Sequence, residues 1–179
     1  MEHQDHVSLL RPADLTAGAS WADLGAGSGA FTLALRELLG TSAEIYAVDR
    51  NRGRLRELER AYNSRFGASD HLHLISADFS KSLDLPALDG ILMANSFHFF
   101  RNKENLLHHV STYLKPGGKL ILVEYNVDRG NPWVPHPLSF ETFCDLAPRA
   151  GFSEPRLLAK QPSSFLREFY SALTYKPAK

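Results

Sequence analysis

Three glycines alternate with other residues in the segment DLGAGSG, which runs from Asp23 to Gly29. Glycine permits sharp turns and lets the backbone approach another group closely, so this pattern indicates a ligand-binding loop. Read from Gly25 to Ala30, the segment fits the G-x-G-x-x-A pattern of dinucleotide sites, where a helix N-terminus holds a pyrophosphate. Read from Asp23, it is acid-x-G-x-G-x-G. A carboxylate there would repel a pyrophosphate and attract a ligand with positively charged groups, which favours the second interpretation.

Polar side chains end four apolar runs along the chain: Asp23, Asp49, Asp78 and Asn95. Short apolar runs bounded by turn residues predict buried strands, and the segments between them have helical spacing. We expect strands at 20–27, 44–50, 71–78, 88–96 and 118–125, and helices at 29–40, 51–66, 101–115 and 140–152. This alternation predicts an α/β fold with a doubly wound, mainly parallel sheet, which binds ligands beyond the carboxyl ends of its strands. The four polar residues should therefore meet at one site.

Two further apolar runs, 155–161 and 165–176, close the chain with only a few residues between them. Strands joined by so short a connection are antiparallel, because a parallel pair needs a longer crossover. A chain of 179 residues fits one domain. We expect a single domain over 1–179, with its core at about 18–175 and an N-terminal segment at 1–17.

Composition excludes several classes of protein. Lys plus Arg and Asp plus Glu each number 20, a balance untypical of nucleic-acid-binding proteins. The one cysteine, Cys144, excludes an internal disulfide and fits a reducing compartment. The start MEHQDHVSLL does not resemble a signal peptide, and no apolar run has the length of a membrane helix. The histidine pairs 71/73 and 108/109 have no third ligand in view, so we expect no metal site. A cytoplasmic location is expected.

Several motifs together resemble the class I S-adenosylmethionine-dependent methyltransferases, in particular the small-molecule members similar to ubiquinone/menaquinone methyltransferases. The motifs are DLGAGSG, YAVD, SADFS, LDGILMANSFHFF and LKPGGKLILVE, and the resemblance covers about residues 18–175. It implies a Rossmann-like sheet of seven strands in the order 3-2-1-4-5-7-6, with strand 7 antiparallel and helices on both faces. It also implies S-adenosylmethionine as cofactor and S-adenosylhomocysteine as product.

The resemblance assigns cofactor-binding roles along the chain. Asp23 and the glycine loop would lie against the amino-acid end and ribose, Asp49 would accept the ribose hydroxyls, and Asn95 would lie near the methionine portion. Asp78 would receive the adenine amine, with Phe79 beside the ring. The implied cofactor-binding residues are Asp23, Gly25, Ala26, Gly27, Gly29, Asp49, Arg50, Asp78, Phe79, Asn95 and Ser96.

The methyl acceptor has to be inferred from other residues. The segment Asn95–His98 differs from the Asn/Asp-Pro-Pro-Tyr motif of amide and nucleobase methyltransferases, and one cysteine is too few for arsenite methyltransferases. His98 could be a general base, or a histidine packed among phenylalanines. Trp133 and His136, in the proline-rich loop 126–139, could wall the acceptor site, or the loop could be a rigid crossover. We expect a small, apolar or planar acceptor, and no nucleic-acid or membrane partner.

Three functions stay open on the sequence alone. The first is an active small-molecule methyltransferase that transfers the methyl group in line. The second is a catalytically silent protein that binds S-adenosylmethionine. The third is an NAD(P)-dependent reductase, in which Arg50 and Arg52 after Asp49 would bind a 2′-phosphate. Arg52, Arg56 and Arg60 share a helix stripe, but interleaved glutamates indicate a solvated face.

Overall fold

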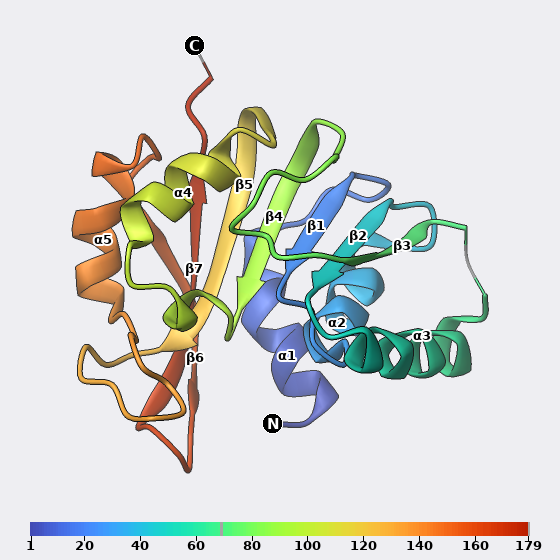
Figure 1. Ribbon diagram of the computed structural model, residues 1–179, viewed down its shortest axis with the longest axis horizontal. Coiled ribbons are helices and arrows are strands. Elements are labelled where there is room, and N and C mark those ends of the chain that lie inside the picture. The colour runs from blue at the N-terminus through green and yellow to red at the C-terminus, as the bar shows by residue number, and fades with distance from the viewer. Residues whose placement is uncertain (69, 179) are drawn as a thin grey trace.

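A computed structural model describes residues 1–68 and 70–178, and its centre is a seven-stranded sheet in the order β3-β2-β1-β4-β5-β7-β6 (Figure 1). Strands β1 to β5 pair in parallel, and β7 is antiparallel to both of its neighbours. The strands are β1 (Trp21–Leu24), β2 (Ile45–Asp49), β3 (Leu72–Ser76), β4 (Leu88–Ala94), β5 (Leu114–Tyr125), β6 (Arg156–Pro162) and β7 (Glu168–Tyr175). The predicted fold class, strand order and antiparallel seventh strand are confirmed.

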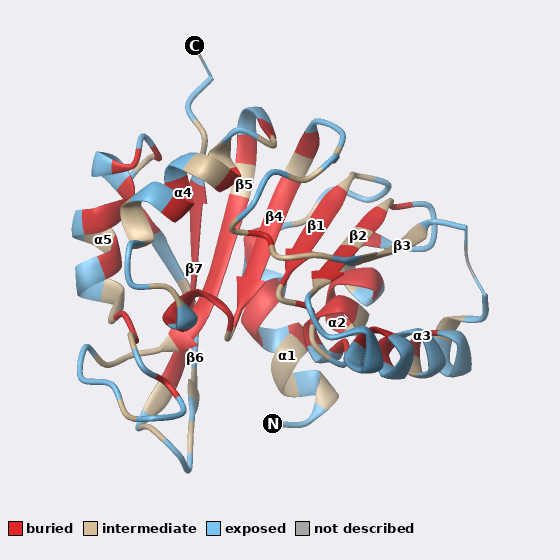
Figure 2. Ribbon diagram, viewed as in Figure 1, coloured by how far each residue is buried: buried red, intermediate tan, exposed pale blue. Residues whose placement is uncertain are grey.

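Helices cover both faces of this sheet. They are α1 (His3–Leu10), α2 (Ala30–Leu39), α3 (Arg52–Phe66), α4 (Lys103–Ser111) and α5 (Phe140–Arg149), with short 3₁₀ turns η1 (Arg11–Ala13) and η2 (Phe97–Phe99). Successive residues of β4 point to opposite faces: Ile91 packs with the core under α4 and α5, and Leu92 with the core under α1 and α2. Figure 2 shows the central strands buried along most of their length. Both faces being covered explains the nearly continuous apolar runs of these strands.

The N-terminal segment forms a helix that the sequence analysis did not predict. In α1, Val7, Leu9 and Leu10 are buried in the core beneath α1 and α2. The helix packs against α2 and the edge strand β6. It therefore closes one face of the sheet. None of the helices within 1–68 and 70–178 is long and apolar enough to cross a membrane.

The boundary between α4 and β5 differs from the prediction. The helix was expected over 101–115 and the strand over 118–125, but α4 ends at Ser111 and β5 begins at Leu114. Leu114 pairs with Leu88 before the register shifts at Gly90, so residues 115–118 bulge within one long strand. A buried apolar residue pairing across the sheet outweighs the turn signal of Pro-Gly-Gly. The predicted C-cap at Gly40 and the solvated face of α3 are confirmed.

Candidate functional site

The glycine loop connects β1 to α2 at the carboxyl edge of the sheet. Gly25, Gly27 and Gly29 all have positive φ, at +89°, +56° and +95°, a region that favours glycine. A Cβ on Gly25 would overlap Ser96, and one on Gly29 would come within 2.5 Å of Leu58. At Gly27 the nearest atom is an Arg54 guanidinium nitrogen at 3.9 Å. Two of the glycines thus permit close packing within the chain, whereas Gly27 leaves room for another molecule.

The Asp49 carboxylate anchors this loop. Its Oδ2 accepts a hydrogen bond from the Gly27 amide at 2.9 Å, and its Oδ1 accepts one from the Asn51 amide at 2.7 Å. Each oxygen retains capacity for a further donor. Asn51 also caps α3 by accepting from the amides of Gly53 and Arg54. The end of β2 is therefore held in place next to the glycine loop.

A cavity of about 730 Å³ opens at this edge. Its walls come from the ends of β2, β3 and β4, the start of α3, and the segment after β4. The lining residues include Gly25, Asp49, Arg50, Asp78, Phe79, Asn95, Ser96, Phe99 and Phe100. Seven of the eleven residues predicted to bind the cofactor line this cavity; Asp23, Ala26, Gly27 and Gly29 do not. The parallel strands bring the predicted residues together as expected, and their individual roles stay predictions.

The far wall contains Asp78 and Phe79. Oδ1 of Asp78 accepts hydrogen bonds from the amide and the hydroxyl of Ser80, at 2.9 and 2.7 Å. These bonds, the hydroxyl bond above all, lower the pKa of Asp78, so the group is ionised near neutrality. Phe79 is buried and lies against Phe100, with ring centroids 5.0 Å apart. This wall combines a carboxylate acceptor with a flat apolar surface.

Asn95 is strained and incompletely bonded. Its φ is +52°, which is uncommon for a residue other than glycine. Its amide donates to Val123 O, but its buried Oδ1 has no hydrogen-bond partner among the described residues. The next residue, Ser96, donates its hydroxyl to Leu24 O at 2.6 Å. A strained residue with an unpaired buried acceptor in a cavity wall is typical of a ligand-binding position.

Asp23 lies beneath the loop rather than in the cavity wall. Only 1% of its surface is exposed, and its Oδ2 accepts a hydrogen bond from the Thr32 hydroxyl at 2.6 Å. Burial, helped by repulsion from Asp49, raises the pKa of Asp23 to about 7, although the Thr32 bond acts in the opposite direction. A cationic ligand above the loop would favour the ionised form.

His98 forms a buried pair with Glu124, a residue that the sequence analysis missed. His98 Nδ1 lies 2.8 Å from Glu124 Oε2, and Oε1 of Glu124 accepts from the amides of Phe97 and His98 at 3.0 and 3.1 Å. The His98 ring lies against Phe99, with centroids 4.3 Å apart, and is not part of the cavity wall. The signal for Glu124 was a single carboxylate in the apolar run LILVEY. Such a residue needs a partner.

Lys103 binds the backbone of the same segment, residues 97–100, from the start of α4. Its ammonium donates to the carbonyl oxygens of Phe97 and Phe100 at 3.2 and 2.7 Å. Burial lowers the pKa of Lys103 to about 8, and the nearby Glu124 carboxylate opposes this effect. The backbone around His98 is thus held by a carboxylate on one side and an ammonium on the other.

Trp133 and His136 both lie in the loop 126–139, outside the cavity wall. The His136 amide donates to His98 O at 3.0 Å, which ties the loop to η2. Asn131 Oδ1 accepts from the amides of Trp133 and Val134, so the tip of the loop is an ordered turn. The Trp133 side chain is 71% exposed. The backbone of the loop is therefore held by hydrogen bonds, whereas the Trp133 side chain is exposed to solvent.

Comparison with known proteins identifies the family. Residues 22–120, more than half of the chain, match the family described as "Methyltransferase domain". The chain belongs to the class I S-adenosylmethionine-dependent methyltransferases.

Two relatives illustrate how far this chain resembles known sequences. It is 29% identical over 175 residues to an arsenite methyltransferase of Aquipseudomonas alcaligenes, covering 87% of this chain and 50% of that protein. It is 32% identical over 111 residues to the ubiquinone/menaquinone biosynthesis C-methyltransferase UbiE of Azotobacter vinelandii, covering 58% of this chain and 41% of that one. The chain thus spans half or less of the length of these relatives.

Solved structures share the fold at low sequence identity. The YcgJ protein of Bacillus subtilis has a TM-score of 0.79 at 12% identity, with coverage of 99% of this chain and 100% of that one. A SAM-dependent methyltransferase of Aquifex aeolicus has a TM-score of 0.71 at 18% identity, with coverage of 98% and 99%.

The cavity fits the family's cofactor chemically. An amino-acid-and-nucleoside ligand needs acceptors for its hydroxyl and amino hydrogens, and a flat surface for its base. The cavity offers Asp49, Asp78 and the unpaired oxygen of Asn95 as acceptors, and Phe79 as the flat surface. At Gly27 the loop leaves room for another molecule close to the backbone. The family's cofactor is S-adenosylmethionine, and this set of acceptors with one flat apolar surface is suited to it.

Proposed function

We propose that this protein transfers the methyl group of S-adenosylmethionine to a small-molecule acceptor. The observation that supports this most strongly is the cavity at the carboxyl edge, because it gathers Asp49, Asp78 and the unpaired acceptor of Asn95 around one space. S-adenosylmethionine supplies a methyl group on a positively charged sulfur; when the methyl moves to a nucleophile, the C–S electron pair stays on sulfur. The protein's task is then to hold and align the two reactants.

Each wall of the cavity has one part of the cofactor to hold. Asp49 accepts the ribose hydroxyls with the capacity left on its two oxygens. Asp78 accepts the adenine amine, and Phe79 lies beside the base. Asn95 and the glycine loop hold the methionine portion. Asp23 acts from below the loop, where its negative charge favours the ligand's cationic groups.

His98 acts as the general base when the acceptor carries a proton that must leave. A carboxylate only accepts hydrogen bonds, so Glu124 Oε2 requires that Nδ1 of His98 carry its ring hydrogen. The other nitrogen, Nε2, is then free to take a proton. Glu124 is a positioning residue in this scheme, because it fixes the ring and its tautomer without touching the acceptor.

The chemistry of the chain argues against arsenite as the acceptor, although one relative carries that name. Arsenic(III) is bound by several soft thiolates, and this chain has one cysteine. Cys144 is half-buried in α5, where burial above all raises its pKa and disfavours the thiolate. We therefore place the acceptor among molecules that donate an oxygen, nitrogen, sulfur or carbon nucleophile.

A ligand-binding experiment tests the cofactor. In a thermal-shift assay, S-adenosylmethionine and S-adenosylhomocysteine should stabilise the protein, by about 2.7 kcal/mol at a hundred times Kd, and NADH and NADPH should not. In calorimetry, Asp49→Ala should weaken S-adenosylhomocysteine binding at least tenfold, since a lost hydrogen bond to a charged group costs about 1.5–3 kcal/mol. Asp89→Ala, at the amino end of β4, is the matched control. Stabilisation by NADPH alone would contradict the proposal.

A transfer experiment separates catalysis from silent binding. S-adenosylmethionine with a labelled methyl group is offered with phenols, amines, thiols and carboxylates. His98→Ala and Glu124→Gln should both lower the transfer rate while S-adenosylhomocysteine affinity changes less than about threefold. The deficit of His98→Ala should shrink as pH rises, because an ionised acceptor needs no base. Binding without transfer to any acceptor would support the catalytically silent alternative.

A further inference from the structure

Four aromatic side chains are linked by ring contacts at the carboxyl edge of the sheet, with Phe99 joined to the other three through the buried His98 ring. Phe99, Trp133 and Phe165 are 58%, 71% and 51% exposed, an unusual gathering of large apolar side chains in water. Trp133 meets Phe165 edge to face at 6.3 Å between centroids, and Phe165 lies 6.0 Å from Tyr125. Ring contacts continue from Tyr125 through His98 to Phe99. We call Phe99, Tyr125, Trp133 and Phe165 the aromatic platform.

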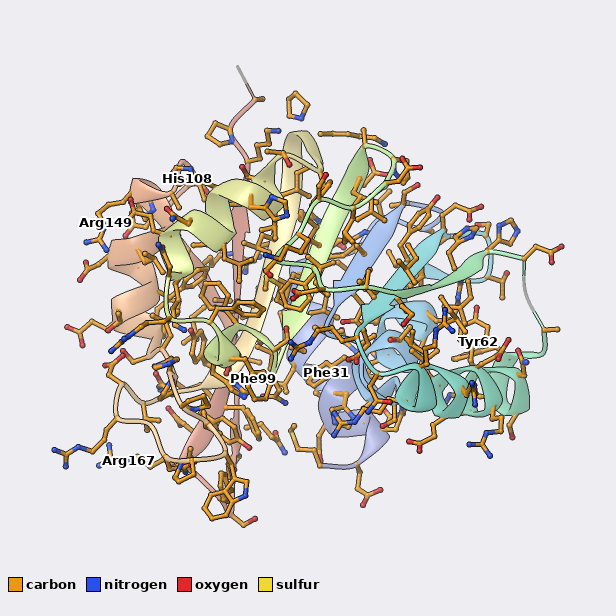
Figure 3. All side chains as sticks on the ribbon, in the orientation of Figure 1. Phe31, Tyr62, Phe99, His108, Arg149 and Arg167 are labelled. Carbon is orange, nitrogen blue, oxygen red and sulfur yellow. The ribbon has the colours of Figure 1, made fainter. Side chains whose placement is uncertain are left out.

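The platform is assembled from segments far apart in the sequence. Phe99 follows β4, Tyr125 ends β5, Trp133 belongs to the loop 126–139, and Phe165 is in the β6–β7 turn. Figure 1 shows that loop and that turn next to one another beyond the carboxyl ends of β4 and β5. Phe99 is labelled there in Figure 3.

The platform is continuous with the cofactor cavity. Phe99 lines the cavity and also contacts His98, which in turn contacts Tyr125. A methyl acceptor has to lie within bonding reach of the cofactor and beside any base that takes its proton. The surface next to both Phe99 and His98 is the platform.

From this arrangement, and resting on the proposed methyl transfer, we propose that the aromatic platform binds the acceptor and that the acceptor is a planar aromatic small molecule. The four side chains carry no charge, and Glu124 below them is already bonded to His98 and two amides. Flat aromatic faces and edges bind another ring better than an aliphatic group of equal size. The exposed Trp133 and Phe165 rings select for shape, and His98 supplies a ring nitrogen beside the platform.

Fluorescence provides the test, since the protein has two tryptophans, the buried Trp21 and the exposed Trp133. With saturating S-adenosylhomocysteine present, 4-nitrophenol is titrated and the quenching of Trp133 is followed. Calorimetry compares it with cyclohexanol, which should bind roughly two- to tenfold more weakly. Phe165→Ala and Phe165→Leu should each raise the Kd of 4-nitrophenol about fivefold or more, while Phe165→Tyr should keep it. Tyr175→Ala, an exposed aromatic at the other end of β7, is the control.

Several results would overturn the proposal. Equal binding of cyclohexanol, or parental affinity in Phe165→Leu, would mean that the surface is apolar without preferring rings. A dimer in sedimentation that Phe165→Ser converts to a monomer would make the platform an interface between two copies. Failure of the proposed function would be recognised by a different result, because S-adenosylhomocysteine would then give no thermal shift. Binding of 4-nitrophenol that depends on Phe165, together with labelled methyl transfer to a phenol, supports the inference.

Discussion

Replacing Asp23 by asparagine should make the ligand-free protein more stable near neutral pH. Asp23 is almost fully buried under the glycine loop, and among the described residues its side-chain partner is the Thr32 hydroxyl. Asparagine has the same shape and its Oδ1 accepts the same hydrogen bond, but it never ionises. The substitution removes a buried negative charge and puts an amide NH2, which needs acceptors, in place of one oxygen; that second cost does not change with pH, so the pH dependence reports the charge alone.

The size and the sign follow from the pKa. In the folded chain the pKa of Asp23 is raised from 3.8 to about 7, mainly by burial. Well below the unfolded pKa of 3.8 the carboxyl is protonated in both the folded and unfolded states and costs no stability. As pH rises, the unfolded chain ionises first and stability is lost, up to about 4 kcal/mol above pH 7. At pH 5 the loss is about 2 kcal/mol.

Urea unfolding at pH 5 and pH 8 measures this. The advantage of Asp23→Asn over the parent should grow by about 2–3 kcal/mol between the two values. Asp84→Asn, an exposed aspartate, should show no comparable growth. A stability advantage that is constant with pH, or that shrinks toward pH 8, would refute the idea that ionisation of the buried Asp23 carboxyl destabilises the fold.

Two further predictions concern the stability effect of adding a Cβ atom at Gly25 and of removing the hydroxyl of Tyr170. Gly25→Ala should destabilise the fold by about 1–3 kcal/mol more than Gly40→Ala, because an added Cβ overlaps Ser96 in the first case and meets open space in the second; urea midpoints that fall equally would contradict this. Tyr170→Phe should leave stability unchanged or raise it by about 1 kcal/mol, because the buried hydroxyl has no hydrogen-bond partner among the described residues and lies near the Glu124 charge. A thermal-denaturation loss for Tyr170→Phe would reveal a partner such as a buried water.

The sheet and much of the cavity could be predicted from the sequence because both follow local patterns. Apolar runs mark the strands, and the residue that ends each parallel strand lies at the same edge as the others. Asp49, Asp78 and Asn95 meet for this reason. The order of the strands came from the resemblance to a family, since local periodicity carries no information about which strands are neighbours.

The remaining features depend on contacts between distant residues. Glu124 reads as one more strand residue until β5 is placed beside the segment that contains His98. Phe165 lies in a turn between two strands, and only the fold brings it to Trp133. The three glycines have one signature in the sequence, yet Gly25 and Gly29 accommodate neighbouring side chains while Gly27 leaves open space. Such differences require the coordinates of the neighbours.

The two halves of the site come from different parts of the chain. The cavity wall ends at Phe100, whereas the platform, apart from Phe99, begins at Tyr125. The region that matches the methyltransferase family ends at residue 120, between them. On the proposed function, mutations in the second part should alter which molecule is methylated while S-adenosylmethionine is still bound. New acceptors could be acquired in evolution by replacing the loop 126–139 and the β6–β7 hairpin. A chimera joined within β5 would be the design for transferring the acceptor preference of one such protein to another.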